Sequence, residues 1–131
     1  MKKAVLLIVE KNGKILFARR HKDRSSLPDK WSLPSETMKE NQSVEETAKH
    51  CALSELGIKL SSIEVAEEYH FHKGDEQKTL YFVKVKSEDI PKINKETELT
   101  KLEWRSWKNF FTTYPFTEIG HGLQYLKKRY V

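Results

Sequence analysis

A continuous run of apolar residues near the amino terminus constrains the fold of this chain more than any other feature. Residues 4–9, AVLLIV, follow two lysines and precede Glu10, Lys11 and an Asn12-Gly13 turn. The run is far shorter than the roughly 18 apolar residues that span a bilayer, and no small-residue cleavage site follows it. An apolar run without polar alternation is typical of a strand that is covered on both faces. We therefore expect a central strand with helices on both sides of its sheet.

The next elements are predicted by alternation and by capping residues. Residues 14–19 resume after the turn with alternating apolar positions, which indicates a hairpin with the first strand. Ser43 is a good N-cap, Glu46 stands at the capping-box position, and Gly57 is a natural helix end. The sequence therefore predicts a helix between Ser43 and Gly57.

Strands and a terminal helix are expected in the second half of the chain. Strands are predicted at residues 63–71, 79–85 and 99–104. The tail from Phe116 repeats apolar residues at three- and four-residue steps, which is typical of a helix docked on a core. It closes with the cations of residues 127–129, which suit the negative end of a helix dipole.

Length and composition fit one domain of the α/β class over residues 1–131. The chain is 37% hydrophobic and 33% charged, with a formal net charge of +5 that attracts anions such as phosphates. Its one cysteine, Cys51, rules out an internal disulfide and points to a reducing compartment, so we expect a cytoplasmic protein. We expect no membrane segment, because no apolar run is long enough to span a bilayer.

The features around the predicted helix resemble the Nudix (MutT-like) hydrolase superfamily. Trp31 and the Leu33-Pro34 pair precede the helix, which ends with the residues ELGI at 55–58, and a hairpin comes before them. An acidic residue six positions before a later tryptophan, here Glu98, is also similar to that family. The resemblance covers nearly the whole chain and implies a Nudix-type α/β/α sandwich with a mixed β-sheet.

The signature box of that family aligns with this chain without a gap. The box reads Gly, five residues, Glu, seven residues, Arg-Glu-apolar, one residue, Glu-Glu, one residue, Gly-apolar, and its last pair falls on Gly57-Ile58. Ala52, Glu55, Gly57 and Ile58 fit the pattern. The other positions are replaced: Glu36 for the opening glycine, Gln42 for the first glutamate, His50 and Cys51 for the Arg-Glu pair, and Ser54 for the next glutamate.

These replacements bear directly on metal binding. Residues 51, 54 and 55 share one side of a helix, and glutamates there hold divalent cations through oxygen ligands. In the family those cations, normally Mg²⁺ or Mn²⁺, bind a pyrophosphate and activate water. Here only Glu55 remains as a metal ligand, because Cys51 is a soft ligand and Ser54 a neutral one. We expect Mg²⁺ or Mn²⁺ if the protein is active, or no metal at all.

The resemblance also implies catalytic and substrate-binding residues. Glu55 and Glu98 are the candidate catalytic acids. Arg19 and Arg20 match positions where family members carry basic residues near the substrate, and arginine forks suit phosphate oxygens. Glu36 is a further candidate, since it stands in the loop that opens the box.

Several functions stay open at this point. One hypothesis is a Nudix enzyme that cleaves a nucleoside diphosphate linked to another moiety, with weakened or lost hydrolysis. Another is a non-catalytic module that binds a nucleotide or RNA, and a third is a scaffold domain with a vestigial cleft. A transition-metal site is a further alternative, built from His50, Cys51, His70 and His72. A homodimer is also possible, since the resemblance implies a family in which homodimers are common.

Overall fold

The strands and helices of this protein follow the expected order, with some short additions. The computed structural model describes residues 2–20, 29–93 and 99–130. The strands are β1 (Lys2–Lys11), β2 (Lys14–Arg20), β3 (Trp31–Ser32), β4 (Ser35–Thr37), β5 (Ser62–Lys73), β6 (Glu76–Lys86) and β7 (Leu99–Arg105). The helices are α1 (Val44–Leu56), α2 (Trp107–Thr113) and α3 (His121–Tyr130), with a 3-10 turn, η1 (Phe116–Glu118), before α3.

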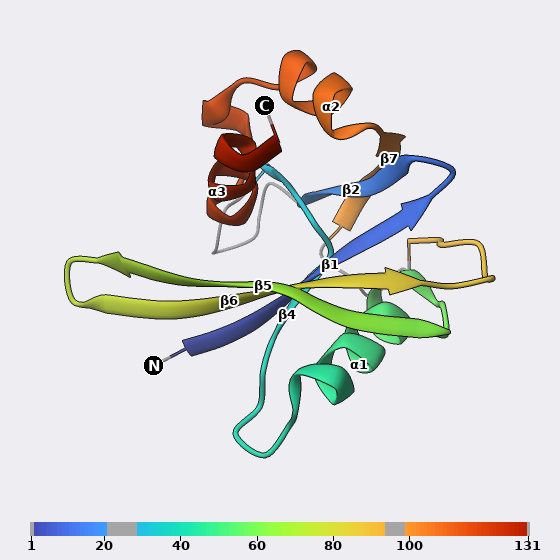
Figure 1. Cartoon of the computed structure of the whole chain (residues 1–131), viewed down its shortest axis with the longest axis horizontal. Helices are drawn as coiled ribbons and strands as arrows, with labels where there is room; N and C mark the ends of the chain where they lie inside the picture. Colours follow the sequence, from blue (N-terminus) through green and yellow to red (C-terminus); the bar gives the residue numbers. More distant parts are fainter. Residues whose placement is uncertain (1, 21–28, 94–98, 131) are drawn as a thin grey trace.

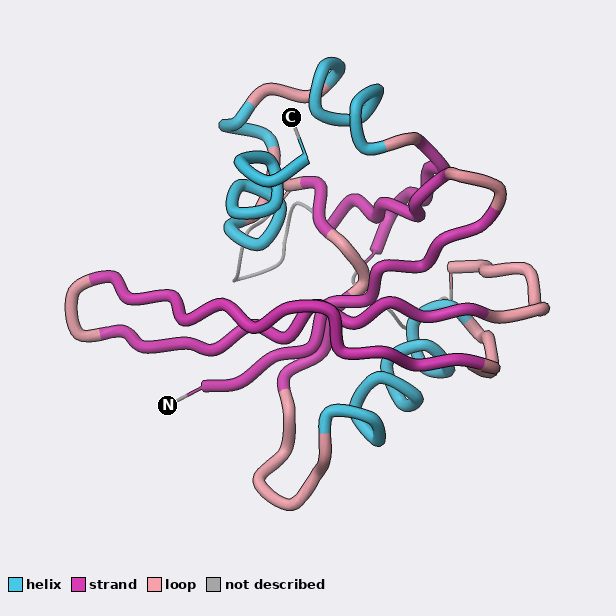
Figure 2. Tube along the Cα trace, viewed as in Figure 1, coloured by secondary structure: helices cyan, strands magenta, loops and turns pink. Residues whose placement is uncertain are grey.

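Strand β1 lies at the centre of one mixed sheet. It pairs antiparallel with β2 and β4 and parallel with β6, in the order β3-β2-β1-β6-β5, while β7 pairs with β2. Residues 4–9 are all buried, and Val5 and Leu7 are completely inaccessible to solvent. The covered central strand predicted from this apolar run is therefore confirmed. Figure 2 shows that the β5–β6 ribbon extends past the other strands at one end of the sheet.

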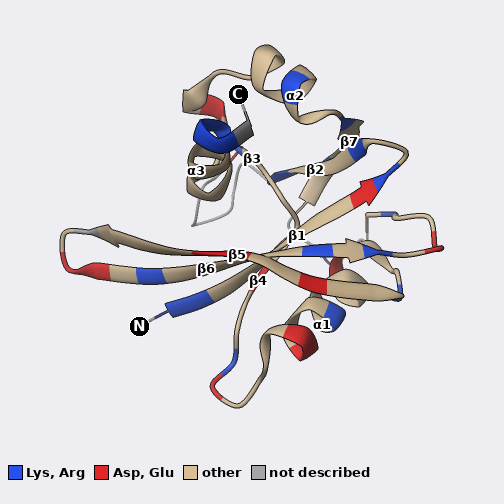
Figure 3. Cartoon of the chain, in the orientation of Figure 1, with Lys and Arg blue, Asp and Glu red and all other residues tan. Residues whose placement is uncertain are grey.

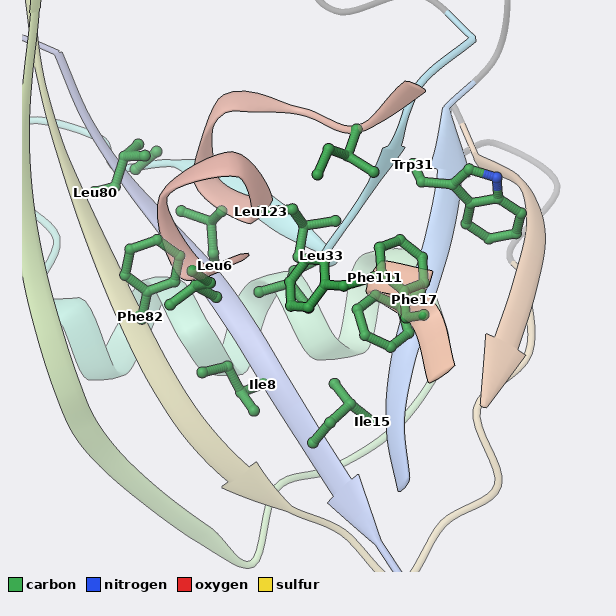
Figure 4. Close-up of a cluster of buried hydrophobic side chains, with 14 residues drawn as sticks. Leu6, Ile8, Ile15, Phe17, Trp31, Leu33, Leu80, Phe82, Phe111 and Leu123 are labelled. Atoms are coloured by element: carbon green, nitrogen blue, oxygen red, sulfur yellow. The ribbon is translucent and has the colours of Figure 1, made fainter. Parts of the chain in front are cut away.

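Helices cover both faces of the sheet, as the α/β/α prediction requires. Helix α1 lies on one side and α2 and α3 lie on the other (Figure 1). Alternate residues of β1 point to the two sides: Leu6 and Ile8 join the cluster under α2 and α3, whereas Leu7 and Val9 join the cluster under α1. Figure 4 shows the first cluster, in which Leu6 lies near Leu123 of α3. No helix within the described ranges has the length and apolar character needed to cross a membrane.

Helix α1 begins and ends at the residues that the sequence marks. Ser43 is the N-cap, and its side-chain oxygen accepts a hydrogen bond from the backbone N–H of Glu46 at 3.0 Å. Gly57 is the C-cap in the left-handed conformation, with φ 65°, and its N–H donates to the last turn of the helix. These caps satisfy backbone groups that a helix end otherwise leaves unpaired. They hold residues 50–55 in one regular helical frame.

The structure differs from the sequence-based prediction in short elements. The short strands β3 and β4 and the two-turn helix α2 were not expected, and residues 116–119 form a 3-10 turn and an extended residue instead of the first turn of the last helix. Glu36 lies in β4, opposite Val5 of β1, and not in a free loop. Elements this short carry too few residues to produce a recognisable period.

The left-handed cap at Gly57 yields a stability prediction. A Cβ at position 57 would meet no atom within 4 Å, so only the backbone conformation opposes a side chain there. We expect Gly57→Ala to lower the free energy of unfolding by about 1 kcal/mol, because alanine is strained at positive φ. Chemical denaturation measures this change. Gly57→Asn should lower the free energy of unfolding less, since asparagine tolerates the left-handed region. An alanine variant as stable as the wild type would contradict the role of Gly57 as a left-handed cap.

Candidate functional site

The predicted box replacements lie on α1, on the neighbouring strand β4 and, for Gln42, in the loop between them. Cys51 Sγ lies 3.7 Å from Glu55 Oε2, and the Ser54 hydroxyl donates to the Cys51 carbonyl at 3.5 Å. The contact between Cys51 and Glu55 shows that these two side chains share one side of the helix, and helical spacing puts residue 54 beside them. The gapless alignment of the box is thus consistent with the helix that the chain forms.

Cys51 is a buried neutral thiol and not a metal-binding thiolate. Its side chain is completely inaccessible to solvent. Burial raises the pKa of the Cys51 thiol well above its ordinary value, and the negative charges of Glu55 and Glu36 raise it further. Only a deprotonated thiol is a good metal ligand or nucleophile. Position 51 therefore packs against the core in the protein as it stands.

Glu36 is bound by His50, so two of the replaced positions compensate each other. Both carboxylate oxygens of Glu36 lie 2.8 Å from His50 Nδ1. The pair joins β4 to α1, and the His50 side chain is about half exposed, at 53%. Glu36 and Glu55 thus place negative charge on either side of Cys51, but the first of these carboxylates is already engaged.

Gln42 has a structural contact that does not require a charge. Its side-chain oxygen accepts from the backbone N–H of Lys39 and lies 3.3 Å from the Thr47 hydroxyl. The amide oxygen therefore ties the β4–α1 loop to the first turns of α1. A neutral glutamine makes these contacts without adding a carboxylate.

The donor set on α1 fits a hard divalent cation poorly. No group of three or more histidine, cysteine, aspartate or glutamate side chains among the described residues is arranged to hold a metal ion. Glu55 is accompanied by a protonated thiol and a hydroxyl, whereas Mg²⁺ prefers several carboxylate and water oxygens. Glu98 lies outside the described residues, and its predicted catalytic role stays a prediction.

The transition-metal alternative is wrong for its four residues, all of which the structure describes. His50 contacts Glu36 on the α1 side, whereas His70 Nδ1 lies 3.1 Å from the Thr79 hydroxyl on the β5–β6 ribbon. His70 Nε2 also pairs with Glu68 at 3.2 Å. The histidines of β5 and the thiol of α1 form no common ligand set.

The two candidate arginines have different surroundings. Arg19 pairs with Asp29 at 2.8 Å and is partly exposed. Arg20 is 92% buried, since only 8% of its surface is accessible, and it lines a pocket. The pairing of β2 with β7 shifts register between these two residues. Consecutive side chains of a strand also point to opposite faces, so neighbouring arginines meet different surroundings.

The pocket beside Arg20 collects cationic and hydroxyl side chains around an apolar floor. Ala4, Leu6 and Leu80 provide apolar contacts, and α3 contributes its first residues. Ser35 of β4 lines this pocket, while the next residue, Glu36, contacts α1. The polar and aromatic residues around it are Arg20, Ser32, Ser35, Phe71, Lys78 and His121, and no carboxylate among the described residues lines it.

One wall of this pocket is an aromatic pair. The rings of Phe71 and His121 are stacked with centroids 4.8 Å apart and planes 17° from parallel. Sequence reasoning missed Lys78 and His121 as site residues. They come from β6 and from the start of α3, and no local pattern in the sequence joins them to Arg20.

Comparison with known proteins decides the family. The family model described as NUDIX domain matches residues 2–121. The chain belongs to the NUDIX family. The match spans the central sheet, α1 and the start of α3, so the pocket and the box residues both lie within the NUDIX domain. A search of curated protein sequences returns no match.

Solved structures share the fold of this NUDIX domain at low sequence identity. A MutT protein from Methanosarcina mazei Go1 is 16% identical, with a TM-score of 0.81 over 97% of this chain and 90% of that chain. A MutT NUDIX hydrolase from Burkholderia pseudomallei is also 16% identical, with a TM-score of 0.82 over 99% and 98%. A MutT protein from Bacillus halodurans is 20% identical, with a TM-score of 0.73 over 98% and 80%.

The buried thiol gives a pH-dependent prediction. Because the folded pKa of Cys51 lies above that of the unfolded chain, its contribution to stability is complete below about pH 8.5 and is lost as pH rises toward the folded pKa. We expect the stability advantage of the wild type over Cys51→Ala to shrink between about pH 7.5 and about pH 10. Urea denaturation at both pH values measures this, and the tyrosines, common to both proteins, cancel. A constant advantage would contradict the prediction.

Proposed function

We propose that this NUDIX domain binds a nucleoside diphosphate linked to another moiety and hydrolyses its pyrophosphate weakly or not at all. The observation that carries the proposal is the buried, protonated Cys51 beside Glu55, where the family gathers carboxylates. A neutral thiol and a hydroxyl give a divalent cation little to bind. The fold and the helix of the box are retained, whereas fewer of the carboxylates that would bind catalytic metal ions are present.

Ligand binding is supported by the pocket on the other face of β4. Arg20, Lys78 and His121 offer hydrogen-bond donors toward a phosphate, and charge-assisted hydrogen bonds of this kind are strong. Ser35 and Glu36 are neighbours in β4 and point to opposite faces of the sheet, so the strand separates a ligand in the pocket from the box residues on α1.

A non-catalytic nucleotide- or RNA-binding module is the second candidate. It is supported by the same contrast: cationic side chains line the pocket, while Cys51 and Ser54 stand where the family pattern has carboxylates. The two candidates differ in whether metal-dependent release of product is measurable. They share the prediction that nucleotide binding depends on the pocket.

The first test restores the missing acids. The purified protein is incubated with a panel of nucleoside diphosphate derivatives and Mg²⁺ or Mn²⁺, and product release is compared with that of Ser54→Glu and Cys51→Glu/Ser54→Glu. We expect the double variant to gain about tenfold or more, since oxygen ligands beside Glu55 hold the cation that lowers the barrier by several kcal/mol.

Leu53→Glu is the matched control for this test. It adds one negative charge to α1, as Ser54→Glu does, but at an exposed position, with 54% of the Leu53 surface accessible, and should not raise the rate. The single Ser54→Glu variant, at a half-buried position, guards against misfolding of the buried substitution. Rapid metal-dependent release by the wild type that Glu55→Gln abolishes would overturn the weak-hydrolysis proposal.

The second test addresses binding by the pocket. Lys78→Gln should weaken the binding of an adenosine nucleotide about tenfold, because a hydrogen bond to a charged group contributes about 1.5 kcal/mol. Isothermal titration calorimetry in EDTA measures this without hydrolysis. Lys84→Gln, an exposed lysine on the same strand β6, is the control and should leave affinity unchanged. Equal affinities of both variants and the wild type would argue against the pocket.

A further inference from the structure

A second pocket lies at the start of β1, where β4 leaves the sheet and the loop to α1 begins. Its lining includes Lys2 and Lys3 of β1, Thr37 at the end of β4, and Lys39 and Glu40 of the loop. Its volume of about 470 Å³ falls within the usual range for small-molecule sites. Nothing in the proposed function above uses this pocket.

The lysines give this second pocket an excess of positive charge. All three are exposed, and Glu40 is the one acid among the described residues that line it. Within the described part of the chain, no ion pair engages Lys2, Lys3 or Lys39. Figure 3 shows basic residues at the start of β1 and on the β4–α1 loop. A concave surface of one charge sign concentrates ions of the opposite sign.

The two pockets follow one another along the β1–β4 ladder. Leu6 pairs with Ser35 beside the first pocket, and two residues further along the ladder Ala4 pairs with Thr37. The backbone N–H of Met38 then donates to the Lys3 carbonyl at 2.8 Å, at the second pocket. Two residues along a strand span about 6.6 Å, so the pockets are neighbours.

The β1–β6 ladder connects the two pockets a second time. Lys2 lies opposite Lys78 in the parallel register, and adjacent strands are about 4.8 Å apart. Lys2 lines the second pocket, and Lys78 lines the first. A cationic path therefore leads from Arg20 through Lys78 to Lys2 and Lys39.

We propose that the second pocket binds a further phosphate group of an elongated ligand whose first phosphate lies near Arg20 and Lys78. This inference rests on the proposed nucleotide binding and extends it to the length of the ligand. The added phosphate has two chemical sources: the phosphate chain of a nucleoside polyphosphate, or the next nucleotide of a short oligonucleotide. Both present oxygens that lysine ammonium groups bind.

A ligand-length series tests the proposal. Affinities for AMP, ADP, ATP, adenosine tetraphosphate and the dinucleotide pApA are measured by calorimetry in EDTA at fixed salt. We expect the wild type to bind the long ligands more tightly than AMP. The triple variant Lys2→Gln/Lys3→Gln/Lys39→Gln should lose about five- to tenfold on the long ligands and nothing on AMP, as exposed ion pairs each contribute modestly.

The matched control removes charge from the opposite end of the same strand. Lys11→Gln/Lys14→Gln alters the β1–β2 hairpin, far from both pockets along β1, and should leave the whole series unchanged. An additional Lys86→Gln substitution matches the charge change of the triple variant at another exposed strand end. If the triple variant and this control lost the same affinity for the long ligands, the cause would be nonspecific attraction between the positive protein and the anionic ligand. That result would overturn the proposal.

The series also separates the two phosphate sources and the two proposals. A gain confined to ATP and the tetraphosphate supports a polyphosphate chain, and a gain confined to pApA supports an oligonucleotide. AMP binding that depends on Lys78 but does not strengthen with ligand length overturns the second pocket alone. Absence of AMP binding overturns the proposed function, and tripolyphosphate binding that ignores the three lysines then overturns the second pocket as well.

Discussion

The double-sided burial of β1 is the constraint on which the rest of this structure depends. Leu6 and Ile8 pack under α2 and α3, while Leu7 and Val9 pack under α1, so one strand joins both layers. Full burial of a large aliphatic side chain contributes about 1.5–3 kcal/mol, which makes this strand the main link between the layers. Its pairing with β4 and β6 then fixes where each pocket lies.

The box region shows how a site can keep its frame while its charge changes. The caps at Ser43 and Gly57, together with the Gln42 contacts, preserve the helix and the loop that the family uses. Here the side chain at position 51 is a buried thiol, and the carboxylate of Glu36 contacts His50. Glu55 is the one acid that keeps its position in the three-residue metal-binding pattern of the box, and this is the basis of the proposal of weak or absent hydrolysis.

Much of the fold followed from local sequence signals. The apolar run at residues 4–9, the Asn12-Gly13 turn and the caps of α1 each act over a few residues, so the sequence alone predicted the elements they produce. The short strands β3 and β4 were missed because two or three residues carry no period. Helix α2, capped by Ser106, was missed because it is only two turns long, and its pattern is dominated by aromatic residues.

The sequence by itself determined the fold class and the helix that carries the box, and it predicted which residues replace the box carboxylates. Tertiary structure alone decided what those residues do: that Cys51 is buried, that Glu36 is engaged by His50, and that Arg20 faces a pocket. The physical reason is distance along the chain. Capping and periodicity act between near neighbours, whereas a pocket is made by side chains from separate strands and helices that only the packed sheet brings together.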